Sequence, residues 1–127
     1  MKFKHENLEV WQLGMDLIDK IYDLAEKYPN KEQFNLKFQI AKSVTSIPLN
    51  ISEGSGRSTN KDFIKYVRIA IGSFLETDTN LKIAIRRKYL TDEDYEYVDE
   101  DIKRLYFKLI GLEKALKFKK RKRKYED

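Results

Sequence analysis

The chain has 127 residues but no cysteine, one histidine and only two prolines. The lack of cysteine excludes disulfides, thiolate catalysis and cysteine-based metal sites, and it suits a reducing compartment. Di-iron bundles need a Glu-x-x-His motif on each of two helices, which the single His5 cannot supply. A Ser-His-Asp triad would require His5 to fold back onto a serine, and GSG at 54–56 is shorter than the glycine pattern of a phosphate loop. We therefore expect no catalytic residue, no metal and no cofactor.

Long apolar runs are also missing, and the N-terminal sequence MKFKHENLEV lacks the apolar stretch of a secretory signal. We therefore expect a soluble, cytoplasmic protein with no membrane partner. A length of 127 residues with 41% hydrophobic and 13% aromatic content suits one hydrophobic core and is short for two. One folded domain is expected.

Excess positive charge is absent everywhere except at the C-terminus. Residues 1–116 contain 19 Lys or Arg and 19 Asp or Glu, so their formal charges cancel, whereas residues 117–124 contain seven Lys or Arg in the sequence KFKKRKRK. The formal net charge of +5 therefore arises within residues 117–127. We divide the chain into a folded body, residues 1–116, and a basic C-terminal tail, residues 117–127.

Apolar residues recur at helical spacings of three and four in four segments, about residues 8–28, 33–53, 60–88 and from 92 onward. This pattern predicts an all-α protein. The apolar series of the fourth segment is typical of the seam of a helical bundle. It consists of Tyr95, Val98, Ile102, Leu105, Leu109, Leu112 and Leu116. Thr59 or Asn60 is the candidate cap of the third helix, with Asp62 three residues after Thr59, and Thr91 followed by Asp94 is the candidate cap of the fourth.

The apolar series of the second segment consists of Leu36, Ile40, Val44, Ile47 and Ile51. Pro48 lies within this series, so it interrupts a helix instead of starting one. An interior proline loses a backbone hydrogen bond and costs about 3 kcal/mol or more, so we predict that the second helix is kinked at Pro48. The bend either fits the helix around its neighbours or brings Asn50 and Glu53 into a contact site.

The third segment is apolar around roughly two-thirds of its circumference, whereas one core-facing stripe needs little more than about 100°. The excess predicts a second buried surface, most simply against another copy of the chain. The residues expected in this oligomer interface are Asn50, Glu53, Tyr66 and Ile69. Lys61, Lys65 and Arg68 fall on the narrow polar face, and together with Arg57 they form a basic stripe that should face solvent or a ligand.

Seven of the ten residues from Asp92 to Asp101 are acidic, and the remainder of the fourth segment is predominantly basic. This order follows the helix dipole. The acidic start either stabilises its own helix or meets a basic patch of another subunit and fixes the register between them.

Three stretches carry the pattern of a known family. They are ENLEVWQLGMDL near the N-terminus, AKSVTSIPLNISEGSGR around Pro48, and FIKYVRIAIGSFLETDTNL in the third segment. Each resembles the four-helix-bundle protein family encoded in intervening sequences of bacterial 23S ribosomal RNA genes. The residues that match its motifs are Pro48, Asn50, Ile51, Glu53, Gly54, Gly56 and Arg57, then Ala70, Gly72, Ser73 and Glu76. The resemblance implies an antiparallel up-and-down four-helix bundle that forms a homopentamer and has no known catalytic activity.

The chain also looks like the accessory proteins of diversity-generating retroelements. The resemblance implies basic pentameric bundles that bind nucleic acid and a reverse transcriptase. The body of this chain departs from that pattern, because residues 1–116 are neutral and the positive charge is confined to the tail. This departure argues against an extended basic surface.

Two classes of function follow from the sequence. The favoured one is a non-enzymatic homo-oligomer that binds RNA or DNA without sequence preference, because a dense basic tail neutralises phosphates. The nucleic-acid-binding residues predicted in the tail are Lys117, Lys119, Lys120, Arg121, Lys122, Arg123 and Lys124, and the second candidate surface is the stripe Arg57, Lys61, Lys65 and Arg68. The alternative is a protein interaction scaffold or an accessory subunit, with the tail only a solvated segment.

Overall fold

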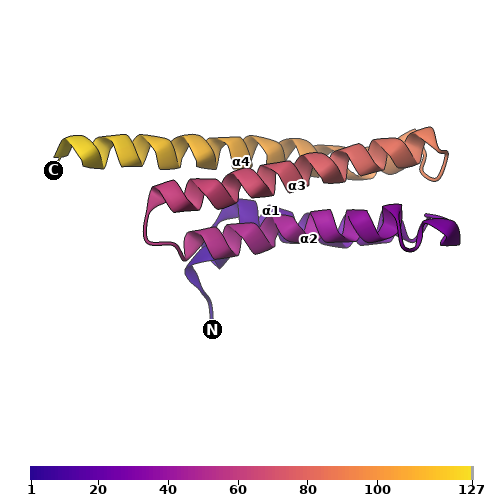
Figure 1. Ribbon diagram of the computed structural model, residues 1–127. Coiled ribbons are helices and arrows are strands. Elements are labelled where there is room, and N and C mark those ends of the chain that lie inside the picture. The colour runs from indigo at the N-terminus through magenta and orange to yellow at the C-terminus, as the bar shows by residue number, and fades with distance from the viewer. Residues whose placement is uncertain (127) are drawn as a thin grey trace.

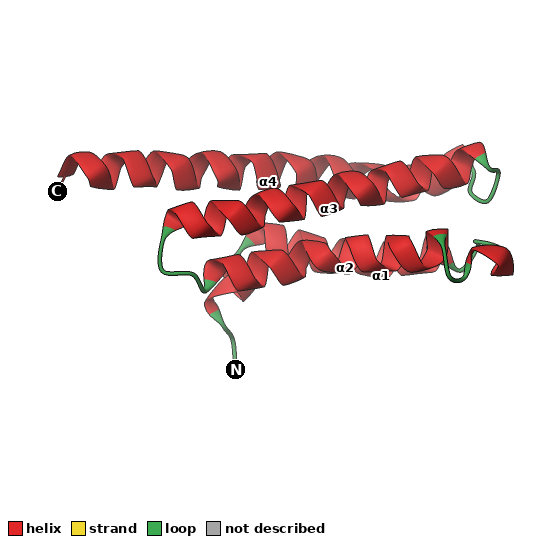
Figure 2. Ribbon diagram, viewed as in Figure 1, coloured by secondary structure: helices red, strands yellow, loops and turns green. Residues whose placement is uncertain are grey.

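The computed structural model describes the backbone of residues 1–126 and the side chains of residues 1–118. Within this part of the chain the α-helices are α1 (Glu9–Ala25), α2 (Leu36–Ser55), α3 (Asn60–Arg86) and α4 (Asp92–Glu126), with short 3-10 helices η1 (Lys4–Asn7) and η2 (Asn30–Glu32). The described residues form no strand (Figure 2). None of the described helices combines the length and the apolar composition required to cross a lipid bilayer. The predicted all-α four-helix bundle is confirmed.

The four helices form a ring around the core, because α1 and α3 each pack against both α2 and α4 (Figure 1). Side-chain contacts fix the directions of the helices. Trp11, at the start of α1, donates from Nε1 to Ser52 Oγ near the end of α2, at 3.0 Å. Arg68, near the start of α3, donates from Nε to Glu113 Oε2 in the second half of α4, at 2.6 Å. The helices of each of these pairs therefore run in opposite directions.

The predicted caps at Thr59 and Thr91 are confirmed. Thr59 Oγ1 accepts a hydrogen bond from the Asp62 N–H at 3.2 Å. At Thr91 the contact is reciprocal, because Oγ1 accepts from the Asp94 N–H at 3.1 Å and Asp94 Oδ2 accepts from the Thr91 N–H at 2.8 Å. These contacts satisfy backbone donors that a helix start leaves unpaired. Local sequence therefore fixes where α3 and α4 begin.

The core is built from the apolar series that the sequence predicts. The largest fully buried aliphatic side chains are Leu17, Ile21, Ile40, Val44, Ile47, Ile51, Val67, Leu81, Val98, Leu105 and Leu109. Burying each of these side chains stabilises the fold by about 1.5–3 kcal/mol. All four helices contribute to this set. Detachment of any one helix would therefore expose apolar side chains of that helix and of its neighbours.

The loop between α1 and α2 is longer than expected. α1 ends at Ala25 instead of residue 28, and α2 begins at Leu36 instead of residue 33. After α1 the N–H groups of Lys27 and Tyr28 donate to the Leu24 and Ala25 carbonyl oxygens, each at 3.0 Å, and the extended Pro29 (φ −70°, ψ 158°) then leads into η2. Tyr28 is still buried, with 4% of its surface exposed, so the core series of α1 continues past the end of the helix.

Pro48 lies inside α2 and is buried against α1. A Cβ added at Gly14 of α1 would lie 3.4 Å from Pro48 Cδ and 3.6 Å from Ile47 Cγ2. A Cβ at Gly14 would thus be in ordinary van der Waals contact with both side chains, and the proline ring packs closely against α1 at this position. The kink at Pro48 stays a prediction.

Gly54 marks a close approach of α2 to α3. A Cβ built on Gly54 would lie 2.7 Å from Tyr66 Cβ and 2.8 Å from Phe63 Cδ1, which is too close for two carbon atoms. Gly72, on the outer side of α3, is the opposite case, because nothing lies within 4 Å of a Cβ added there. An alanine at Gly54 therefore tests packing, whereas an alanine at Gly72 tests helix propensity alone.

Gly54→Ala is expected to lower the free energy of unfolding by about 1–3 kcal/mol, because the two aromatic residues must shift to admit the methyl group. Gly72→Ala is the matched control, and it is expected to raise the free energy of unfolding by up to about 1 kcal/mol. Urea unfolding followed by circular dichroism measures both. Equal stability of the two variants would contradict the close approach at Gly54.

Candidate functional site

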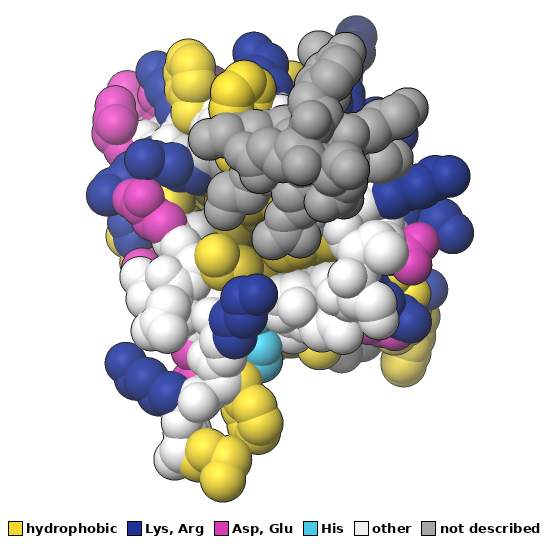
Figure 3. All heavy atoms as spheres, turned by 90° about the vertical axis from the view of Figure 1, so that its left-hand side faces the viewer, with side chains coloured by type: hydrophobic (Ala, Val, Ile, Leu, Met, Phe, Trp, Pro, Cys, Tyr) yellow, Lys and Arg dark blue, Asp and Glu magenta, His cyan; other side chains and the backbone are white. Residues whose placement is uncertain are grey.

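Exposed lysines lie at the end of the bundle where α3 begins and the C-terminal part of α4 is found. Lys61 and Lys65, on the first turns of α3, are exposed and form no ion pair with a described side chain. Lys114, on α4, is also exposed. Figure 3 looks onto this end of the molecule and shows dark blue Lys and Arg side chains around much of its rim. Free ammonium groups in this position can contact an anion without breaking a contact within the bundle.

The two arginines of the predicted basic stripe are already engaged. Arg57 donates from Nη2 to Glu53 Oε1 at 2.9 Å and to the Tyr66 hydroxyl at 2.5 Å, and its guanidinium carbon lies 4.7 Å from the Tyr66 ring centroid. Arg68 pairs with Glu113 of α4, as described above. The stripe therefore divides into two free lysines and two arginines that hold neighbouring elements together.

The first ten residues of the predicted tail, 117–126, continue α4 without a break. Leu116 is buried, Lys117 is exposed with its Nζ 3.9 Å from Glu113 Oε2, and the helix runs on to Glu126. Helical geometry carries the chain about 15 Å beyond Leu116 over these ten residues. The remaining predicted tail residues, whose side chains lie outside the described part of the structure, are Lys119, Lys120, Arg121, Lys122, Arg123 and Lys124.

The residues predicted to form an oligomer interface lie on the side of the bundle formed by α2 and α3. Asn50 is half-buried and donates from Nδ2 to the Ser46 carbonyl oxygen at 2.8 Å. Glu53 and Tyr66 are joined through Arg57, and Ile69 is 46% exposed. The fold thus brings Glu53, Arg57 and Tyr66 together where α2 ends and α3 begins. The oligomer interface itself stays a prediction.

The sequence reasoning missed an apolar surface on α1 and α2. Trp11, Met15, Ile18 and Tyr22 of α1 follow one another at spacings of 4, 3 and 4, on a stripe beside the core series. Exposed Leu49 of α2 lies next to this stripe. The groove between the two helices measures about 300 Å³ and is lined by Trp11, Met15, Ile18, Thr45, Pro48, Leu49 and Ser52. The helical spacing of these α1 residues was a signal for this surface. In the sequence, however, the same spacing is equally typical of a wider buried face of the helix.

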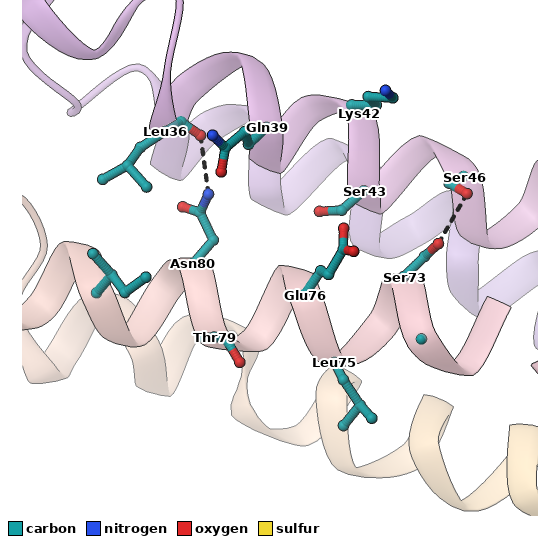
Figure 4. Close-up of a pocket in the computed structure, with 12 residues that line it drawn as sticks. Leu36, Gln39, Lys42, Ser43, Ser46, Ser73, Leu75, Glu76, Thr79 and Asn80 are labelled. Atoms are coloured by element: carbon teal, nitrogen blue, oxygen red, sulfur yellow. Dashed lines mark hydrogen bonds between the residues drawn. The ribbon is translucent and has the colours of Figure 1, made fainter. Parts of the chain in front are cut away.

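A second, wider groove of about 720 Å³ runs between α2 and α3 (Figure 4). Polar contacts join the two helices along its floor. Ser73 Oγ donates to Ser46 Oγ at 2.9 Å, and Asn80 donates from Nδ2 to the Leu36 carbonyl oxygen at 3.0 Å (Figure 4). Every buried side-chain nitrogen and oxygen in the described residues has a hydrogen-bond partner. The buried polar residues of this groove, Ser43, Thr77 and Asn80, and the Ser46–Ser73 pair therefore join α2 to α3, whereas Lys42, Glu76 and Thr79 form no hydrogen bond or ion pair between the helices in the described residues.

These observations define the class of the molecule: a four-helix bundle with free lysines at one end and apolar surface along its sides. The family model for the 23S rRNA-intervening sequence protein matches residues 6–111. The chain belongs to this family, and the resemblance noted from the sequence is confirmed.

The chain is also similar to a solved structure from Bacteroides thetaiotaomicron VPI-5482, a protein of unknown function from the S23 ribosomal protein family. The two are 31% identical, with a TM-score of 0.74, and the match covers 83% of this chain and 98% of that chain. A comparison with curated proteins finds no match.

Burial raises the pKa of the Tyr28 hydroxyl above its ordinary value of 10.0. This hydroxyl donates to Asn80 Oδ1 at 2.8 Å, on the inner side of the α2–α3 contacts. In the unfolded chain Tyr28 loses its proton near pH 10, whereas in the folded protein it keeps the proton to higher pH. Its contribution to stability is therefore complete below about pH 10 and is lost as the pH rises further.

We expect the free energy of unfolding to fall above about pH 10, and Tyr28→Phe to make this fall shallower by up to about 1 kcal/mol per pH unit. At neutral pH the same variant should be less stable by about 1 kcal/mol, because Asn80 loses a donor. Tyr22→Phe, at an exposed position of α1, is the control. Urea unfolding from pH 7 to pH 11 tests this, and identical slopes in Tyr28→Phe and the wild type would contradict it.

Proposed function

We propose that this protein is a non-enzymatic, homo-oligomeric bundle that binds RNA or DNA without sequence preference through its basic end. The observation that carries the proposal is the position of the charge. The whole formal net charge of +5 belongs to residues 117–127. Of these, residues 117–126 continue α4 beyond Leu116, the last buried residue among the described side chains. Lys61 and Lys65, which form no ion pair with a described side chain, lie at the same end of the bundle.

Lysine and arginine contacts of this kind neutralise phosphates and release counterions, which gives affinity but little base readout. The family description names 23S rRNA, so RNA is the first nucleic acid to test. In a homo-oligomer, and above all in the pentamer that the resemblance implies, several basic ends would bind one strand together, and avidity would strengthen weak individual contacts.

A protein interaction scaffold, or an accessory subunit that does not bind nucleic acid itself, is the second candidate function. The observation that favours it is the apolar surface left on the sides of the bundle, where Leu49 and Ile69 are 66% and 46% exposed. Exposed apolar patches commonly mark protein interfaces. In this function the predicted contact residues Asn50, Glu53, Tyr66 and Ile69 would bind another copy or a partner protein.

Binding of a fluorescent single-stranded RNA, measured by anisotropy across a salt series, tests the favoured function. The full chain is expected to bind with a steep salt dependence, a slope of up to about −5 for seven phosphate contacts. A chain ending at Leu116 is expected to lose most of this affinity and most of the slope. If the full chain and the shortened chain bind equally, or neither binds, the tail is not the nucleic-acid site.

The contribution of α3 is tested separately. Lys61→Glu/Lys65→Glu is expected to weaken RNA binding about tenfold or more at low salt, because two phosphate contacts become repulsive. Lys31→Glu/Arg87→Glu is the matched control: it makes the same change of charge at exposed positions, η2 and the C-terminal end of α3, and it should bind as the wild type does. Equal losses in both variants would show that net charge alone matters.

A further inference from the structure

Two phenyl rings project from the second half of α4, on the face that points away from the core. Phe107 is 77% exposed and Phe118 is 68% exposed. The other exposed aromatic side chains described on α4 have contacts within the fold, because the Tyr106 ring lies 5.4 Å from the Phe74 ring and Tyr97 donates a hydrogen bond from its hydroxyl. Among the described residues, neither phenylalanine packs against another ring or a cation. The fold itself therefore makes little use of these two rings.

The two rings lie on one line along α4, with a glycine and a lysine between them. Gly111 follows Phe107 by four residues, Lys114 by seven and Phe118 by eleven, which is about one, two and three helical turns. Nothing lies within 4 Å of a Cβ added at Gly111. Lys114 is exposed and forms no ion pair with a described side chain. We call these four residues the Phe107–Phe118 line, which consists of a ring, open helix backbone, a free ammonium group and a second ring.

The rings are too far apart to clasp a single flat group between them. Eleven residues of α-helix span about 16 Å, and the rings stay about that far apart because helical side chains all lean toward the N-terminus. Two rings that sandwiched one base would lie about 7–8 Å apart, which is twice the contact distance between carbon atoms. Each ring can therefore stack on a separate base of one strand, with the Lys114 ammonium between them to contact phosphate.

Charge limits the part of this face that suits an anion. Glu100 and Glu96 lie on the same line, seven and eleven residues before Phe107, and both are exposed. Among the described residues from Phe107 onward, Glu113 is the only carboxylate of α4; its side chain is 16% exposed and contacts Arg68 of α3. The surface that a polyanion can contact therefore begins near Phe107 and runs toward the basic tail.

The Phe107–Phe118 line suits a nucleic acid better than a protein segment. A protein interface usually centres on a continuous apolar patch, whereas a glycine and a lysine separate the two rings. The two grooves described above lie between α1 and α2 and between α2 and α3, on other sides of the bundle. Separate aromatic rings along a positively charged track are typical of surfaces that bind single strands.

We propose that the Phe107–Phe118 line binds single-stranded nucleic acid by stacking its two rings on unpaired bases, which gives the protein a preference for single strands over duplexes. This inference rests on the nucleic-acid binding of the proposed function and adds a contribution that depends on bases. In a duplex the base faces are stacked on one another, and the deep, narrow major groove of A-form RNA does not admit side chains. Lysine contacts to phosphate alone do not provide this preference.

Anisotropy with a fluorescent single-stranded RNA of about twelve nucleotides, within the usual site size, tests the proposal across a salt series. In the full chain, Phe107→Ala and Phe118→Ala are each expected to weaken binding about 5- to 150-fold, which corresponds to one base–aromatic stack. The salt slope should not change, because no phosphate contact is lost. Lys114→Ala is expected to make the slope shallower by about 0.7.

Three controls separate stacking from charge. Phe38→Ala removes a phenyl ring that is 58% exposed near the start of α2, at the opposite end of the bundle, and should bind as the wild type does. Duplex RNA and inorganic polyphosphate offer phosphates without free base faces, so Phe107→Ala should bind both as tightly as the wild type does. Phe107→Trp should restore binding of the single strand, because a larger ring keeps the stack. Circular dichroism verifies that each variant folds.

Four results would overturn the proposal, and they distinguish its failure from that of the proposed function. If both alanine variants bind the single strand as the wild type does, stacking is wrong, although binding through the tail stands. If the wild type binds none of the probes, stacking and the proposed function fail together. Equal losses for single strand, duplex and polyphosphate would show that the rings do not contact bases. A smaller mass of Phe107→Ala than of the wild type, by light scattering, would assign this face to a contact between protein chains.

Discussion

The close contact of α2 with both of its neighbours is the constraint on which the rest of the structure depends. On one side the Pro48 ring meets α1 at Gly14, and on the other side Gly54 leaves no room for even a methyl group against Tyr66. Leu49 lies two residues from the fully buried Ile47 and Ile51 and therefore on the opposite face of α2, so this apolar side chain is 66% exposed. The SIPLNISEG motif thus sets both the packing of the bundle and the apolar surface beside it.

Several charged side chains of α4 form ion pairs with α1 of the same chain. Its acidic start contacts α1 through Lys20–Asp101 at 2.6 Å and Lys27–Asp94 at 2.5 Å, and its basic half reaches Glu9 through Arg104 at 2.7 Å. Pairs this exposed contribute only about 0–1 kcal/mol each. Because the polarity of these pairs changes once along the two helices, a reversal of the direction of α4 relative to α1 would bring like charges together. They therefore favour the antiparallel direction of α1 and α4 more than they add to the stability of the bundle.

Much of the fold could be predicted from the sequence, because spacings of three and four residues identify which side of each helix is buried and Thr-x-x-Asp identifies where two helices begin. The candidate sites could be predicted only in part. That Arg57 stacks on Tyr66 and that Arg68 reaches Glu113 depends on contacts between helices, which charge patterns along one helix do not contain. The helical spacing of Trp11 and Tyr22 could be recognised in the sequence. Only the three-dimensional packing, however, shows which apolar residues of α1 face the core and which face outward. The loop boundaries around η2 likewise depend on where Pro29 leaves the helical path.

The surfaces of the bundle are separated by position as well as by chemistry. The lysines with no described ion pair, Lys61 and Lys65, lie at one end, while the apolar α1–α2 groove and the more polar α2–α3 groove run along the sides. An oligomer built through the sides of the bundle would leave its ends open, and in a ring of equivalent copies all basic ends point in the same direction. Assembly and nucleic-acid binding would then reinforce each other, because each added copy brings another cluster of cations to the same face of the ring. In the proposed function, this arrangement would let a small, otherwise neutral body bind a long polyanion strongly without an extended basic surface on any single chain.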